Sequence, residues 1–148
     1  MIAHYHSVEI VIETRSSTES LVAAFLPGKI QSSSFAPNGE VLGDDSGDTT
    51  ITRMRYKESS QLKLIVCPAT SDAQGADAQI QQLCAELNDF PKAARCEWDQ
   101  AELREFYVGY DVDGIECFHT SHFCQDTIIA AAAVRAAIGF VIYRDRNS

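Results

Sequence analysis

The chain has few basic residues, no long apolar run and no secretion signal, and each of these shortages excludes a class of protein. Its 12 lysines and arginines stand against 21 aspartates and glutamates, so the formal net charge of −9 disfavours binding to nucleic acid. The longest apolar run, residues 128–134, has seven residues, whereas a membrane-spanning helix needs roughly 20. The N-terminus lacks a basic segment followed by an apolar one, so we expect a cytoplasmic protein that is not attached to a membrane.

The five cysteines show none of the spacings typical of a metal finger or a redox pair. Their number is odd and no CxxC occurs, so they are expected to be free thiols that serve as small apolar side chains. Motifs for nucleophilic catalysis and nucleotide binding are also missing, since the chain has no GxSxG, no Walker loop and no GxGxxG. These absences disfavour an enzyme, and no cofactor is predicted.

The chain does have the composition of one ordinary globular domain. With 148 residues, of which 45% are hydrophobic and 22% charged, it can bury one core without disulfides or metal. We therefore predict a single domain over residues 1–148.

The negative charge is concentrated in one stretch. Residues 72–126 hold twelve acidic and three basic residues and so carry the whole net charge, whereas the rest of the chain is neutral. A concentrated negative field attracts cations and basic proteins and accelerates their association. Acidity of this kind also keeps proteins soluble, and that interpretation stays open.

Hydrophobic periodicity predicts both strands and helices. Alternation predicts strands at 8–12, 49–57, 62–67, 106–112, 115–119 and 140–143. Helical spacing and a capping box at 16–19 predict helices after residue 18, over 76–88 and over 125–138. The last helix is nearly all apolar, so we expect it to lie deep against the sheet and to end at Gly139.

Two further regions complete this prediction. Turn residues between 29 and 48 predict a long loop with a short strand around Val41. On the strand 49–57, Arg53 and Arg55 are expected to form a basic outer face that pairs with nearby acids. Strands beside strands, mixed with helices, indicate an α+β fold, in which three helices pack on a mainly antiparallel sheet of about six strands.

One cluster suggests metal binding. His119, His122 and Cys124 are three possible ligands within six residues. Their side chains do not converge if His119 ends a strand and Cys124 begins a helix, and no HExxH or cysteine pair completes a site. We therefore predict no metal, and keep a small metal- or ligand-binding enzyme centred on these residues as the alternative function.

A hairpin strand, a helix and a terminal strand follow one another in residues 106–143, FYVGYDVDGIECFHTSHFCQDTIIAAAAVRAAIGFVIY. Together with Leu26-Pro27-Gly28 at a helix end and the loop Asn38-Gly39-Glu40, this pattern resembles a family of uncharacterised small bacterial α+β domains. The chain departs from the pattern because its single tryptophan is Trp98 and does not follow the loop. Such domains are similar to many immunity proteins of bacterial toxin systems, which are small, acidic and non-catalytic. The resemblance transfers no catalytic residues.

These observations predict a non-catalytic protein that binds a basic protein, in the first place a toxin domain, and neutralises it by occlusion. The acidic face that docks the partner is expected to contain Glu97, Trp98, Asp99, Glu102, Glu105, Asp111, Asp113 and Glu116. A homodimer formed through an exposed sheet edge at residues 140–143 is a further alternative. The prediction depends on these carboxylates forming one exposed surface.

Overall fold

The structure is a computed structural model that describes residues 2–26, 32–36, 39–43, 49–56, 60–68, 75–113 and 123–144. Its elements are, in chain order, β1 (Ile2–Thr14), α1 (Glu19–Phe25), β2 (Ser32–Ala36), β3 (Gly39–Gly43), β4 (Thr50–Arg55), β5 (Leu62–Cys67), α2 (Gly75–Asn88), α3 (Lys92–Gln100), β6 (Leu103–Asp113), α4 (Gln125–Ala133) and β7 (Ala137–Arg144). The predicted strand 115–119 lies outside the described residues.

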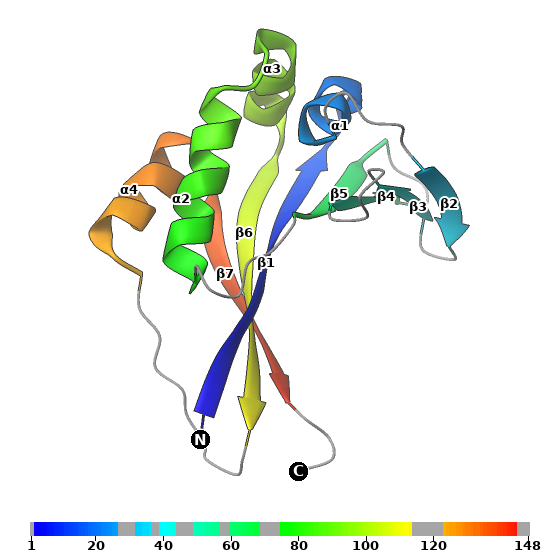
Figure 1. The fold of residues 1–148 in the computed structure, drawn as a ribbon. Coiled ribbons are helices and arrows are strands. Elements are labelled where there is room, and N and C mark those ends of the chain that lie inside the picture. The colour runs from blue at the N-terminus through cyan, green and yellow to red at the C-terminus, as the bar shows by residue number, and fades with distance from the viewer. Residues whose placement is uncertain are drawn as a thin grey trace.

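The strands form one mixed sheet with the order β2-β3-β4-β5-β1-β6-β7. All neighbours are antiparallel except β6 and β7, which are parallel. Figure 1 shows β1, β6 and β7 running along the molecule, whereas β3, β4 and β5 turn away to one side. The predicted α+β class with a mainly antiparallel sheet is confirmed, and the described residues contain seven strands and four helices.

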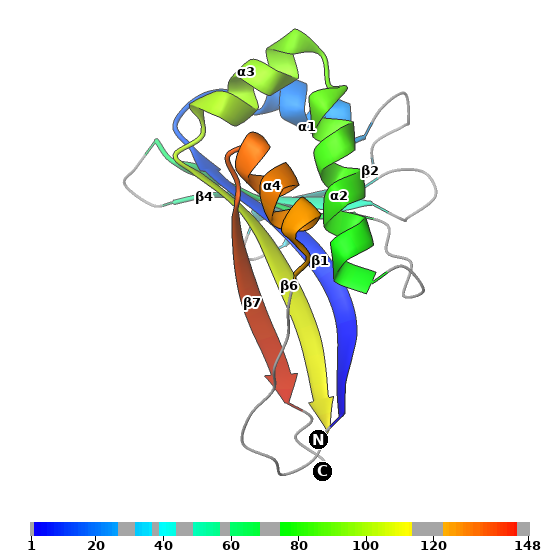
Figure 2. The same cartoon turned by 90° about the vertical axis from the view of Figure 1, so that its left-hand side faces the viewer.

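The core lies between the sheet and the helices, which gather on one face (Figure 2). Cross-strand register places one apolar row on this face from β3 to β7: Leu42, Ile51, Val66, Ile10, Phe106 and Ile138. All four helices add buried apolar residues to the same cluster, among them Leu21, Leu83, Trp98 and Ala131. Strand side chains alternate between faces, and no described helix covers the opposite face of the sheet (Figure 2).

In strand β4, the side chains predicted to face outward, those of Ile51 and Arg53, lie on the helix-covered face of the sheet. Ile51 is fully buried and Arg53 lies on the same, helix-covered face. There the Arg53 guanidinium contacts Glu40 of β3 at 2.6 Å and Glu19 of α1 at 3.0 Å. The expected basic outer face is therefore wrong for Arg53, whereas its pairing with nearby acids is confirmed.

The region between residues 29 and 48 contains more regular structure than predicted. Both β2 and β3 form there and pair antiparallel, where the sequence predicts one short strand in a loop. Glycine is needed at position 39, because its φ of +141° suits no other residue and an added Cβ would meet the Arg53 carbonyl. A segment rich in turn-forming residues can thus contain paired strands, and its composition alone does not predict them.

Helix α3 is a helix that the sequence analysis does not predict. Pro91 stands at its N-cap, and within the helix Ala94 and Trp98 are buried, four residues apart. Two buried positions in nine residues, both without a large aliphatic neighbour in the helix, produce a weak periodic signal, so the segment resembles a polar linker.

Helix α4 ends earlier and lies less deep than predicted. It stops at Ala133, and Arg135 follows with φ of 60°, the left-handed conformation that often ends a helix. Gly139 lies inside β7. Ile128 and Ile129 are 54% and 56% exposed, and α4 packs against α2 and the edge strand β7. No described helix has both the length and the apolar character that crossing a membrane requires.

Candidate functional site

Two acids of the predicted face already have partners within the chain. Glu97 turns inward, and its Oε1 accepts a hydrogen bond from the backbone N–H of Leu21 at 2.8 Å. Glu102 is exposed, but its carboxylate lies 3.5 Å from Arg15 Nε and accepts a hydrogen bond from Gln61 at 3.3 Å. Glu97 therefore serves the fold, and the charge of Glu102 is partly compensated.

The other acids of the predicted face are spread over the molecule. Asp99 is exposed on α3, and Glu105 is half-buried on the helix-free face beside Gly139. Asp111 and Asp113 belong to the far end of β6, roughly 20 Å or more from Glu105 at about 3.3 Å per residue. Glu116 lies outside the described residues. Glu97, Asp99 and Glu105 therefore do not share the single exposed surface that the sequence analysis predicts.

Trp98 is a core residue, which corrects its expected place on an exposed face. Its side chain is 4% exposed, and its indole N–H donates to the Val134 carbonyl at 2.8 Å. Arg104 strengthens the same junction, because its guanidinium donates to four backbone carbonyls at the ends of α3 and α4: Trp98, Asp99, Ala101 and Arg135. Together these two side chains fix α3 to the end of α4.

Of the predicted metal cluster, Cys124 lies within the described residues, and His119 and His122 do not. The backbone N–H of Cys124 donates to Asp77 at 3.0 Å, and its thiol lies 3.2 Å from the Thr127 hydroxyl. Thr127 donates to Asp77 at 2.6 Å, and this hydrogen bond lowers the pKa of Asp77. These contacts attach the start of α4 to α2. No group of three metal-ligating side chains occurs among the described residues, and the alternative function stays a prediction.

The predicted sheet edge at residues 140–143 exists, because β7 is the last strand of the sheet. Phe140 and Ile142 are 50% and 59% exposed there, and Phe140 stacks against Phe123 and Tyr110. A homodimer through this edge is neither supported nor opposed by these contacts and stays a prediction.

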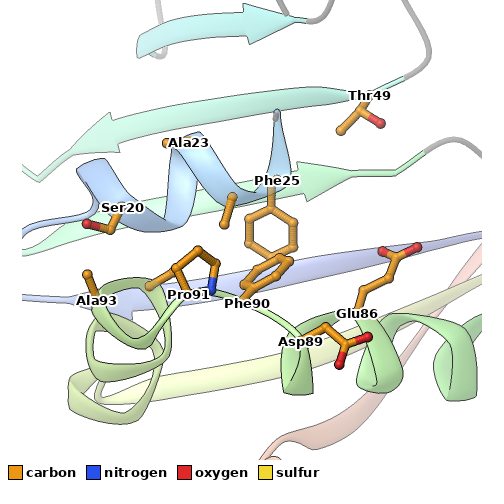
Figure 3. A pocket seen from close by; sticks show the side chains of 11 residues that line it. Ser20, Ala23, Phe25, Thr49, Glu86, Asp89, Phe90, Pro91 and Ala93 are labelled. Carbon is orange, nitrogen blue, oxygen red and sulfur yellow. The ribbon is translucent and has the colours of Figure 1, made fainter. Parts of the chain in front are cut away.

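A pocket of about 730 Å³ opens between α1 and the corner where α2 passes into α3 (Figure 3). Its size falls within the range of sites that bind small ligands or peptide side chains. Helix α2 ends at Asn88 and Pro91 stands at the N-cap of α3, so the chain turns between them and places Phe90 opposite α1. The pocket thus forms where the end of α1 meets the corner between α2 and α3.

Two aromatic rings form the middle of the pocket. Phe25, the last residue of α1, and Phe90 meet edge-to-face, with ring centroids 5.0 Å apart and an angle of 83° between the ring planes. Both rings are half-buried. Small apolar side chains, among them Ala23 and Ala93, complete this part of the lining.

Two carboxylates stand at one end of the same pocket. Figure 3 shows Glu86 and Asp89 there, with the two rings between them and Pro91 at the other end. Both acids are exposed, and neither forms an ion pair within the described part of the chain. Glu86 accepts one hydrogen bond, from Gln82 at 3.3 Å. The pocket therefore combines uncompensated negative charge with aromatic surface.

A smaller hollow of about 260 Å³ shares Phe90 with this pocket. Its lining contains Lys92, Arg95, Cys96 and Asp99, so both signs of charge are present. Asp99, an acid of the predicted face, thus lines a hollow next to the pocket.

Sequence reasoning places Glu86 and Asp89 in the acidic stretch but does not single them out. A signal was available, because both acids stand near the C-terminal end of a predicted helix, where cations are the favoured residues. Phe90 and Pro91 follow directly, and this combination of acids, an aromatic residue and a helix-ending proline marks the corner.

Comparison with known proteins finds no matching family model, no similar curated protein and no similar solved structure. The resemblance to immunity proteins therefore stays a prediction.

Proposed function

We propose that this protein is a non-catalytic binding protein that docks a basic protein partner at the α2–α3 corner. The partner is proposed to be a toxin, which the protein neutralises by covering its working surface. The observation that carries the proposal is the position of Glu86 and Asp89 at the mouth of an aromatic pocket, where neither acid forms an ion pair with another described residue.

Long-range electrostatics support this function. A chain with a formal charge of −9 attracts a basic protein over distances of about a Debye length, roughly 10 Å at 0.1 M salt. Complementary charge raises the association rate more than it raises the final affinity. The half-buried rings of Phe25 and Phe90 then supply apolar contact that slows dissociation.

The proposed surface differs from the one predicted from the sequence. Glu97 and Trp98 make internal contacts, and the acids of β6 lie along the sheet away from the helices. Glu86 and Asp89 come from the same acidic stretch and lie beside apolar surface, which is the combination that protein interfaces use. Asp99 belongs to the edge of this surface.

The test uses the protein encoded by the reading frame adjacent to this one. We expect that protein to arrest growth when it is produced alone and growth to resume when the two are produced together. The purified pair should form a complex whose association rate falls at least about tenfold between 20 mM and 500 mM NaCl. Failure to restore growth, or an association rate that does not change with salt concentration, would contradict the proposal.

A matched pair of variants locates the surface. The double variant Glu86→Lys/Asp89→Lys should slow association by a further factor of ten or more. The control Glu102→Lys/Asp126→Lys changes the net charge equally through two exposed acids outside the pocket lining. An equal effect of both double variants would show that net charge, and not the corner, governs docking.

A further inference from the structure

We propose that the pocket between α1 and the α2–α3 corner binds an arginine side chain of the partner, together with an apolar residue next to it. This inference rests on the proposed function for the identity of the partner. The choice of arginine rests on the pocket itself, through three features argued in turn below.

The first feature is the electrostatic potential at the end of α2. Glu86 lies in the last turn of the helix and Asp89 directly follows it, and the last turn contains no basic residue. The C-terminal end of a helix carries a partial negative charge, so two carboxylates there reinforce an unfavourable potential instead of cancelling it. Such an arrangement costs stability in the free protein, and a bound cation relieves it.

The second feature is the pair of aromatic rings. Because Phe25 and Phe90 meet edge-to-face at 83°, their contact leaves ring surface that the partner ring does not cover. A guanidinium group is planar, stacks on such surface and donates several hydrogen bonds to carboxylates at the same time. A lysine ammonium group is a compact, strongly hydrated charge and uses the rings less well. The site therefore fits arginine better than lysine.

The third feature is the volume of the pocket that an arginine side chain would leave unfilled. A volume of about 730 Å³ exceeds what one arginine side chain fills. Figure 3 places the acids at one end and Pro91 and Ala93 at the other, with the aromatic rings between them. A segment with a leucine next to the arginine would put its charged group at the acidic end and its aliphatic group against the small apolar residues.

The probe is the capped dipeptide N-acetyl-Leu-Arg-amide, compared with the same peptide carrying citrulline, which has the shape of arginine without its charge. Titrations are followed by amide chemical shifts in NMR spectra of the full chain. We expect a Kd in about the millimolar range for the arginine peptide, with shifts at Phe25, Glu86 and Phe90. The citrulline peptide should bind at least about tenfold more weakly and the lysine peptide a few-fold more weakly.

Variants assign the binding to the two acids. Glu86→Gln/Asp89→Asn keeps the size of both side chains and should weaken the arginine peptide about five- to twenty-fold, with little effect on the citrulline peptide. The control Glu102→Gln/Asp126→Asn should leave both affinities unchanged. Amide spectra of all variants establish that each is folded.

The outcomes separate this inference from the proposed function. Equal binding of the arginine and citrulline peptides, or no binding of either, would overturn the arginine pocket. Growth restored by the unchanged protein in spite of such a binding result would leave the neutralising function intact. Selective peptide binding without any restoration of growth would support the pocket and overturn the proposed function.

Discussion

The carboxylate of Glu97, on α3, accepts a hydrogen bond at 2.8 Å from the backbone N–H of Leu21 in the first turn of α1. This N–H is one of the groups at a helix start that have no partner within the helix. Thr18 stands at the N-cap but makes no side-chain capping bond. Within the local segment, Ser17 accepts a hydrogen bond from the Glu19 N–H at 3.3 Å. The Leu21 N–H is instead capped by a residue 76 positions away, which ties α1 to α3.

Replacing Glu97 should destabilise the protein through this cap. We expect Glu97→Ala to lower the free energy of unfolding by about 1–2 kcal/mol, the usual cost of losing a helix cap, and Glu97→Gln to lower it less. Urea denaturation measures the change. Asp99→Ala is the matched control, because Asp99 is an exposed acid on the same helix. Equal effects of the two alanine variants would show that Glu97 does not act as a cap.

Two buried threonines should respond in opposite directions to the same substitution. Thr127 donates to Asp77 at 2.6 Å, whereas the Thr18 hydroxyl is buried without a hydrogen-bond partner among the described residues. We expect Thr127→Val to cost about 1–3 kcal/mol, and Thr18→Val to be neutral or to stabilise by up to about 1 kcal/mol. Thermal and urea unfolding of both variants provide the comparison, and a clear loss of stability in Thr18→Val would contradict the unpaired hydroxyl.

Local signals predict some of these elements well. Strand β5 and helix α2 match their predicted ranges to within one residue, because each has a strong apolar pattern of its own period. By contrast, the end of α4 depends on Arg135 adopting a left-handed conformation, and its exposure depends on its place over the sheet edge. Neither property is visible in an alanine-rich run.

The candidate site is harder to predict because its halves are far apart in the chain. Phe25 and Phe90 are separated by 65 residues, and they meet because α1 and the α2–α3 corner pack on the same sheet face. The inward turn of Glu97 and the burial of Trp98 have the same origin, since both depend on α3 packing against α1 and α4. Charge counted along the chain cannot distinguish acids that cap helices from acids that face solvent.

The cysteines should differ sharply in their reaction with iodoacetamide. Cys96 and Cys124 are exposed, whereas Cys84 is buried in the core and burial raises its pKa to about 11. At pH 8 the reactive thiolate of Cys84 would then be roughly one thousandth of the total. We expect complete modification of Cys96 and Cys124 while Cys84 stays largely unmodified, as measured by mass spectrometry of peptides. Modification of Cys84 as fast as that of Cys96 would show that α2 is not packed as described.

Asp77 should make the protein less stable in acid. Hydrogen bonds from Thr127 and from the backbone of Cys124 lower its pKa below the ordinary value of 3.8. The unfolded chain therefore binds the proton more readily, so the stabilisation is fully present above about pH 4 and is lost as the pH falls through the lowered pKa. Urea unfolding between pH 2.5 and pH 7 should show this loss in the unchanged protein.

Two variants test whether Asp77 causes that loss. Asp77→Asn cannot ionise, so its free energy of unfolding should be lower at pH 7 and should decline less below pH 4. Thr127→Val removes the hydrogen bond that lowers the pKa most and should flatten the acid decline in the same way. If Asp77→Asn instead lost stability in acid as steeply as the unchanged protein, protonation of Asp77 would not be the cause of the loss.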